Sequence, residues 1–203
     1  MVQDLKLLNS YEVFDYTPAM IKESREKNGG KILMKGILQK ADTLNQNGRI
    51  YPISVLEREV RNYQKFINEN RALGELDHPD SSVVNLKNVS HVIREAYLEG
   101  TVVHGVVELL DTPSGKILQS LVESGVKLGI SSRGVGSTKK QGDYHVVQDD
   151  FQLICWDYVS EPSTPGAFMI PEGKTITDVD LKTIFNKSDR IDRILNDILT
   201  SKK

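Results

Sequence analysis

Short apolar runs alternate with polar stretches along most of the chain, a pattern that predicts several β-strands and a few helices. Strand-like patterns occupy residues 31–45, 89–110, 126–137 and 144–159. In 89–110, two β-rich runs meet at Glu99-Gly100, which predicts a hairpin, and the turn residues in 139–145 predict a second hairpin tip. The first pattern reads as two short strands broken at Gly36, although its apolar run is also compatible with a helix.

Helical spacing of apolar residues, together with start and stop signals, predicts three or four helices. Ser54, with Glu57 three residues later, has capping-box spacing and predicts a helix start there. Thr112, followed by proline, predicts the start of a second helix that stops at Gly125. Residues 179–203 form an amphipathic pattern and predict a C-terminal helix.

The order of these elements defines the fold class. Strands lie between helices without a regular β-α-β alternation, which favours an α+β fold or a closed barrel with attached helices. A length of 203 residues suits one domain with one core.

Composition removes several classes of protein. The chain has 26 basic and 28 acidic side chains, a net charge of −2, which argues against a binder of nucleic-acid phosphates. No apolar run approaches the roughly 18 residues of a membrane span, and the N-terminal sequence is not that of a secretory signal. The single cysteine, Cys155, excludes a disulfide framework or cysteine-rich zinc site and indicates a reducing compartment. The four histidines are His78, His91, His104 and His145.

The segment Gly74-Glu75-Leu76-Asp77-His78-Pro79 carries the first candidate chemistry. A histidine beside an acid in a loop is compatible with a general base held in one orientation, and equally with a solvated surface loop. A metal site needs at least three converging ligands, and Asp77, His78 and Asp80 lack a recognised ligand spacing.

Two later segments carry further candidates. In GISSRGVGS, residues 129–137, a serine followed by glycines fits a nucleophile at a strand end, or a plain polar turn. It is neither a Walker phosphate loop nor a hydrolase nucleophile elbow, because Arg133 stands where the second elbow glycine is required. Asp157 interrupts an apolar strand, so it either orients a histidine or pairs with Arg133.

The chain resembles the prohead core serine proteases of tailed bacteriophages in the order of its motifs: GELDHP, a hairpin, a short helix, GISSRGVGS and WDYVSEPSTPGA. The upstream segment LNQNGRIYP is also similar to that family. The resemblance covers roughly Lys31 to Pro171. It implies an assemblin-like α+β fold, a β-barrel-like antiparallel sheet surrounded by helices. It also implies a single protease domain, 1–203, with its core at about 31–171, an N-terminal extension 1–30 and a C-terminal helical tail 172–203.

The function that the resemblance implies is that of a serine endopeptidase of head maturation. Such an enzyme acts inside the prohead, in the host cytoplasm, and cleaves scaffold proteins, capsid proteins and itself before DNA is packaged. Its partners are therefore protein substrates rather than nucleic acid or membrane, and we expect no cofactor and no metal. The oligomeric state stays open between a monomer, a homodimer and a higher oligomer.

The resemblance also assigns roles to particular residues. His78 matches the catalytic histidine of the Gly-Glu-Leu-(Asn/Asp)-His-Pro motif, and Ser131 matches the nucleophile. The neighbouring Ser132 would point to the opposite face of a strand, so only one of the two can face the site. Asp157 is expected to be the orienting acid, with Glu75 as its competitor.

Arg133 and Gly134 are expected to support the oxyanion through their backbone. The family tends to cut after glutamate, and Lys139, Lys140 and Arg133 are the basic candidates for contact with that acid. We expect the other three histidines to be structural or superficial, and we assign no chemistry to Cys155.

Two other hypotheses compete with the protease. The first is a non-enzymatic scaffold or core protein of the prohead, for which only the charged C-terminal pattern argues. The second is an unrelated serine hydrolase, against which the missing nucleophile elbow counts.

Overall fold

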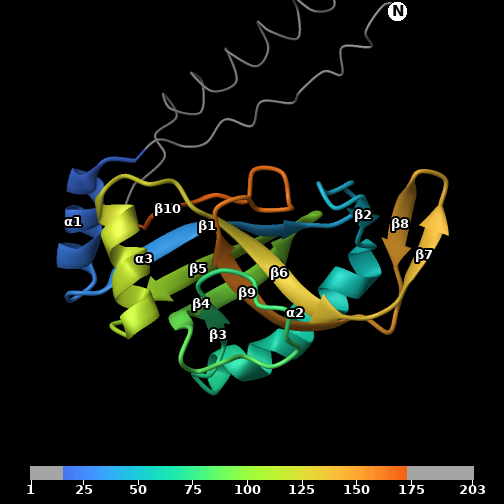
Figure 1. Ribbon diagram of the computed structural model, residues 1–203, viewed down its shortest axis with the longest axis horizontal. Helices are drawn as coiled ribbons and strands as arrows, with labels where there is room; N and C mark the ends of the chain where they lie inside the picture. Colours follow the sequence, from blue (N-terminus) through green and yellow to red (C-terminus); the bar gives the residue numbers. More distant parts are fainter. Residues whose placement is uncertain (1–15, 173–203) are drawn as a thin grey trace, which may run out of the picture. The chain divides into compact units, whose positions relative to one another are not determined.

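The computed structural model describes residues 16–172 and arranges them as three helices and ten strands (Figure 1). In chain order these are α1 (Pro18–Lys27), β1 (Ile32–Lys40), β2 (Arg49–Ile50), α2 (Ile53–Asn68), β3 (Leu73–Glu75), β4 (Val89–Glu99), β5 (Val102–Leu109), α3 (Pro113–Glu123), β6 (Gly129–Val135), β7 (Thr138–Gln141), β8 (Tyr144–Val147), β9 (Gln152–Val159) and β10 (Met169–Pro171). The expected C-terminal helix lies outside the described residues.

The strands form three sheets. The largest has the order β10-β1-β5-β4-β3 and is antiparallel throughout. β6 and β9 pair as an antiparallel ribbon, and β2, β8 and β7 form a small mixed sheet. In Figure 1 the β7–β8 hairpin projects away from the helices α1 and α3.

The expected mixture of helices and sheet is confirmed, but the expectation of a closed barrel is wrong for the described residues. One isolated bridge, Leu76–Tyr158, lies between β3 and β9, and another, Gly129–Phe168, lies between β6 and β10. Each of these pairings is limited to a single bridge because the chain leaves the extended conformation nearby. It does so at Asp77, with a φ of 70°, and at Gly166, with a φ of 79°.

Several local predictions can be compared directly with these elements. The β4–β5 hairpin turns at Gly100, whose φ of 57° suits glycine, as its sequence predicts. β1 is one continuous strand rather than two, and its ladder to β5 is irregular between Ile37 and Gln39. Gly36 marks a close approach instead of a break, because a Cβ there would lie 2.6 Å from the Phe168 carbonyl oxygen.

The two predicted helix starts had different outcomes. Thr112 caps α3 as predicted, accepting a hydrogen bond from the Gly115 N–H at 3.0 Å. The capping box predicted at Ser54 is wrong, because α2 already begins at Ile53 and Ser54 makes no cap. The Ile53 N–H donates instead to Asp42 Oδ1, 3.3 Å away. A side chain eleven positions upstream therefore satisfies this helix end.

The core fills the space between the large sheet, the β6–β9 ribbon and the helices. Trp156 on β9 and Tyr63 on α2 meet edge to face, with ring centroids 4.8 Å apart. α1 lies in the segment expected to be an N-terminal extension, yet its Ile21 is only 1% exposed, so the packed structure begins before Lys31. Among the described residues, no helix combines the length and the apolar character of a membrane span.

Candidate active site

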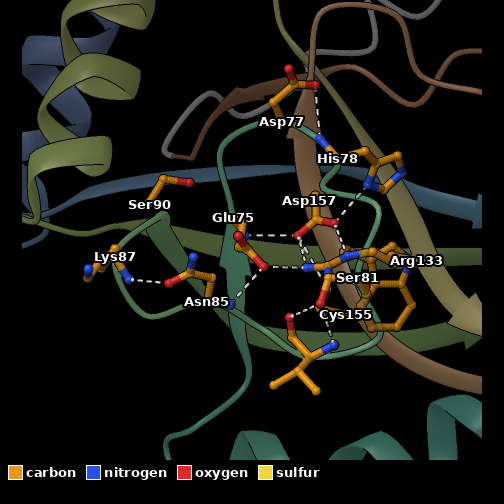
Figure 2. Close-up of polar contacts among 12 residues, drawn as sticks. Glu75, Asp77, His78, Ser81, Asn85, Lys87, Ser90, Arg133, Cys155 and Asp157 are labelled. Atoms are coloured by element: carbon orange, nitrogen blue, oxygen red, sulfur yellow. Dashed lines mark hydrogen bonds and ion pairs between the residues drawn. The ribbon is translucent and has the colours of Figure 1, made fainter.

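His78 lies in the loop that follows β3. Leu76 bridges to Tyr158, and the Asp77 N–H donates to the Tyr158 carbonyl at 2.7 Å, which holds the loop against β9. Asp77 has a φ of 70°, a left-handed conformation that asparagine and aspartate tolerate better than most other residues. This turn directs the chain so that the His78 ring reaches the face of the β6–β9 ribbon (Figure 2).

The β6–β9 ribbon brings four side chains together, those of Ser131, Arg133, Cys155 and Asp157. Ser131 lies directly opposite Asp157 in the antiparallel register, and Arg133 lies opposite Cys155. Because side chains two positions apart share a face, all four belong to the same face of the ribbon. The sequence pattern predicted that Ser131 and Asp157 lie on strands. The register of these two strands shows that the two residues lie side by side.

Asp157 is fully buried and receives hydrogen bonds from four groups (Figure 2). Its Oδ2 lies 2.7 Å from His78 Nδ1 and 2.8 Å from Arg133 Nε, and its Oδ1 accepts from the Glu75 N–H at 2.9 Å and from Cys155 Sγ at 3.2 Å. Burial by itself would raise the pKa of this carboxyl, but the hydrogen bonds from His78 and then Arg133 lower it to about 2. Asp157 is therefore an anion at neutral pH.

Arg133 bridges two buried carboxylates. Besides Asp157, its guanidinium donates from Nη2 to Glu75 Oε1 at 2.7 Å and from Nη1 to the Ser81 carbonyl at 2.7 Å. Glu75 Oε1 also accepts from the Asn85 N–H at 3.0 Å. Arg133 is thus occupied within the protein, which removes its side chain from the basic groups expected to meet a substrate acid.

These contacts separate the two acids that the sequence left in competition. Asp157 contacts the His78 ring directly, whereas Glu75 reaches it only through Arg133. Asp157 therefore contacts both residues that the sequence offered as its partners, a histidine and Arg133.

A cavity of about 360 Å³ opens above this cluster. Its lining residues are Asn47, Arg49, Tyr51, His78, Pro79, Asp80, Ser131, Ser132, Arg133, Gly134 and Ser163. Ser131 is 4% exposed, and its Oγ lies 3.2 Å from Ser163 Oγ. Among the described residues no hydrogen bond joins Ser131 to His78, although both side chains border this one cavity.

The four residues of β6 that line the cavity are Ser131, Ser132, Arg133 and Gly134. The Ile130 N–H donates to the Ala167 carbonyl at 2.8 Å, on the edge of β6 away from β9. Strand alternation then directs the Ser132 N–H to the same outer edge. The register shifts between Arg133 and Gly134, and Gly134 is exposed beside the cavity.

Sequence reasoning assigned no chemistry to Cys155, but its thiol is one of the donors to Asp157. Burial raises the pKa of this thiol, so it stays protonated and able to donate. The signal was available in the sequence, because Cys155 and Asp157 are two positions apart on one strand. Ser163 lies in the motif WDYVSEPSTPGA, but no role was predicted for this residue from the sequence.

The remaining histidines do not line the cavity. His91 is fully buried, with Nε2 2.9 Å from the Trp156 carbonyl and Nδ1 2.9 Å from Ser90 Oγ, and burial lowers its pKa to about 4. His104 lies 3.7 Å from a Glu99 carboxylate oxygen, and His145 is exposed on β8.

Within the described part of the chain, no group of three or more histidine, cysteine, aspartate or glutamate side chains is placed to hold a metal ion, and this covers Asp77, His78 and Asp80. Lys139 and Lys140 lie on the exposed strand β7 and do not border the cavity.

Comparison with known proteins supplies an independent line of information. Residues 4–180 match the family described as prohead core protein serine protease. The prohead core protein protease of Enterobacteria phage T4 is 33% identical over 177 residues, which cover 82% of this chain and 81% of that protein. The structure of the bacteriophage T4 capsid assembly protease superposes with a TM-score of 0.61 at 29% identity, covering 64% of this chain and 82% of the other.

Proposed function

Since this chain belongs to the prohead core protein serine protease family, we propose that it hydrolyses peptide bonds with Ser131 as nucleophile, His78 as general base and Asp157 as the orienting acid. Its role is that of a phage prohead protease, and the comparisons favour this role over a non-enzymatic scaffold protein.

One observation carries the proposal: His78 bonds through Nδ1 to Asp157, which lies directly opposite Ser131 on the adjacent strand. A carboxylate acceptor fixes the proton on Nδ1, so Nε2 is left unprotonated and able to act as a base. The ring and the Ser131 hydroxyl border the same cavity. Hydrogen bonds between base and nucleophile are often long before substrate binds and shorten in the complex.

The reaction is an acyl transfer in two halves. His78 takes the proton of Ser131 as Oγ forms a bond to the peptide carbonyl carbon, and it then protonates the leaving amine as the C–N bond breaks. Water attacks the acyl-enzyme by the same route and restores Ser131. The buried negative charge of Asp157 stabilises the imidazolium that forms in each half.

The outer edge of β6 is the proposed oxyanion site. A carbonyl held against Ser131 would direct its oxygen toward backbone N–H groups at Ser132 and Gly134, next to the irregular register after Arg133. The initial expectation placed this support in the backbone of Arg133 and Gly134. For Arg133 we propose instead that its side chain holds Asp157 in place.

The proposed substrates are scaffold and capsid proteins of the same virus, and the chain itself, inside a prohead assembled in the host cell. For the fold, we propose an assemblin-like arrangement in which the two single bridges, Leu76–Tyr158 and Gly129–Phe168, bring the ribbon against both edges of the large sheet. Residues 1–203 would then constitute one protease with its core centred on residues 31–171.

The decisive experiment compares Ser131→Ala with Ser132→Ala. Each purified protein is incubated with the scaffold and capsid proteins of the virus, and fragments are identified by mass spectrometry. We expect cleavage by the native chain and by Ser132→Ala, and none by Ser131→Ala. Cleavage by Ser131→Ala but not by Ser132→Ala would move the nucleophile by one residue, and cleavage by neither native chain nor variants would refute the proposal.

A further inference from the structure

The hydroxyl of Ser163 is the nearest side-chain partner that the structure gives to the nucleophile. Resting on the serine protease mechanism proposed above, we propose that Ser163 is a catalytic residue that donates a hydrogen bond to Ser131 Oγ throughout the reaction. Two observations support this role: the 3.2 Å separation of the two Oγ atoms, and the position of both residues on the wall of one cavity.

The loop that carries Ser163 is anchored to the strand that carries Ser131. The Ser163 carbonyl accepts from the Gln46 N–H at 2.9 Å. Pro162 packs against Gly129 so closely that a Cβ on this glycine would lie 2.4 Å from the proline ring. Two residues of this loop, Pro162 and Pro165, are buried, and proline fixes one backbone torsion at each. The backbone of Ser163 is therefore held in place beside the strand that carries Ser131.

Either hydroxyl can donate across this 3.2 Å contact, and the proposed mechanism requires that Ser163 be the donor. Each hydroxyl has one proton to donate and can accept through its lone pairs. If Ser131 donated to Ser163, it would have no proton left for His78. When Ser163 donates instead, the Ser131 proton is free to point toward His78, which the mechanism requires.

The same bond becomes stronger as the reaction proceeds. Negative charge develops on Ser131 Oγ as His78 removes its proton, and a hydrogen bond to a charged oxygen is roughly twice as strong as one between neutral groups. In deacylation Ser131 Oγ is the leaving oxygen, so the bond again stabilises developing charge. Ser163 keeps its proton throughout, so the bonds formed and broken are those of the two-step acyl transfer described above.

Ser163→Ala is the test, with Ser163→Thr as the conservative variant and Ser160→Ala, an exposed serine on the same loop, as the matched control. We expect Ser163→Ala to lower kcat for cleavage of the viral scaffold protein about 10- to 100-fold with KM unchanged, the loss of one charge-assisted hydrogen bond. Ser163→Thr keeps the donor and should recover most of the activity.

The rate of reaction with a fluorophosphonate probe reports the nucleophilicity of Ser131 without a peptide substrate. It should fall in Ser163→Ala by a similar factor and stay unchanged in Ser160→Ala, while urea unfolding curves coincide. If Ser163→Ala does not fold, Ser163→Cys, with a weaker donor of similar shape, replaces it and should show intermediate rates.

The outcomes separate this inference from the proposal on which it rests. Native kcat and native probe labelling in the Ser163 variants, together with an inactive Ser131→Ala, would overturn the role of Ser163 and leave the protease mechanism intact. An active Ser131→Ala would refute the mechanism itself, and with it any role for Ser163 toward that oxygen.

Discussion

Replacing Asp157 by asparagine removes the charge at the centre of the site while keeping its shape. The carboxylate accepts from His78 and Arg133 Nε on Oδ2 and from the Glu75 N–H, Cys155 and Arg133 Nη2 on Oδ1. An amide has only one oxygen, so its NH₂ group must face at least two donors on one side or the other. With the NH₂ toward His78, Nδ1 has to accept, which transfers the ring proton to Nε2 and disables the base.

Two magnitudes follow from this geometry. The pKa of Asp157 is about 2 against an ordinary 3.8, which corresponds to roughly 2 kcal/mol of folding stability at neutral pH. Because the folded pKa is depressed, this contribution is fully present above pH 3.8 and is lost as the pH falls toward 2. For activity, the wrong histidine tautomer in a serine protease triad costs about 10⁴ in kcat.

We therefore expect Asp157→Asn to unfold at lower urea concentration at pH 7, with the difference from the native chain shrinking between about pH 4 and pH 2. Its kcat on the scaffold protein should fall by a factor on the order of 10³ to 10⁴. Glu75→Gln is the informative comparison, because it changes a carboxylate that binds Arg133 but not His78, and its kcat should fall much less.

Two results would refute this reasoning. If Asp157→Asn keeps kcat within tenfold of the native value, Asp157 does not set the tautomer of His78. If Glu75→Gln is the more damaging change, the orienting acid has been assigned to the wrong residue. Asp150→Asn, at an exposed carboxylate bonded to Ser137, should leave kcat unchanged and serves as the general control.

Three further predictions concern stability. Burial holds the His91 pKa at about 4 against 6.5, so the free energy of unfolding should fall by up to roughly 3 kcal/mol as the pH drops from 6.5 to 4. His91→Gln should remove this pH dependence in urea unfolding. An unchanged pH dependence in the variant would show that another group causes it. Gly74→Ala would place a Cβ 2.2 Å from both His91 Nε2 and the Trp156 carbonyl, so a loss of more than about 3 kcal/mol is expected, and native-like melting would contradict the packing. Thr112→Ala should cost at least about 1 kcal/mol by calorimetry, because it removes the α3 cap and the hydrogen bond that Thr112 donates to the Val89 carbonyl. Ser114→Ala should cost almost nothing, and equal effects would argue against the role of Thr112.

Features that depend on neighbours in the chain were predictable. The β4–β5 hairpin follows from a glycine between two β-rich runs, and the start of α3 follows from threonine before proline. The left-handed turn at Asp77 likewise belongs to a residue type that tolerates it. In each case the residue type and the backbone conformation or backbone group that it suits lie within a few residues, so local rules suffice.

The α2 start shows where such rules stop. Ser54 and Glu57 have the spacing of a capping box, but the Asp42 carboxylate is delivered to the helix end by the turn after β1 and takes the role. The same limit explains the barrel expectation, because pairing between strands distant in sequence depends on where each chain leaves the sheet.

From its residue pattern alone, the chain can be recognised as an α+β protein whose candidate chemistry lies at His78, Ser131 and Asp157. The fold itself was needed to show that Asp157 rather than Glu75 contacts His78, to give Arg133 its two carboxylates, and to bring Ser163 against Ser131. His78 and Asp157 are 79 positions apart, and hydrogen bonds over such separations depend on strand register and loop packing. Periodicity records which face a side chain occupies, but not which distant side chain it meets there.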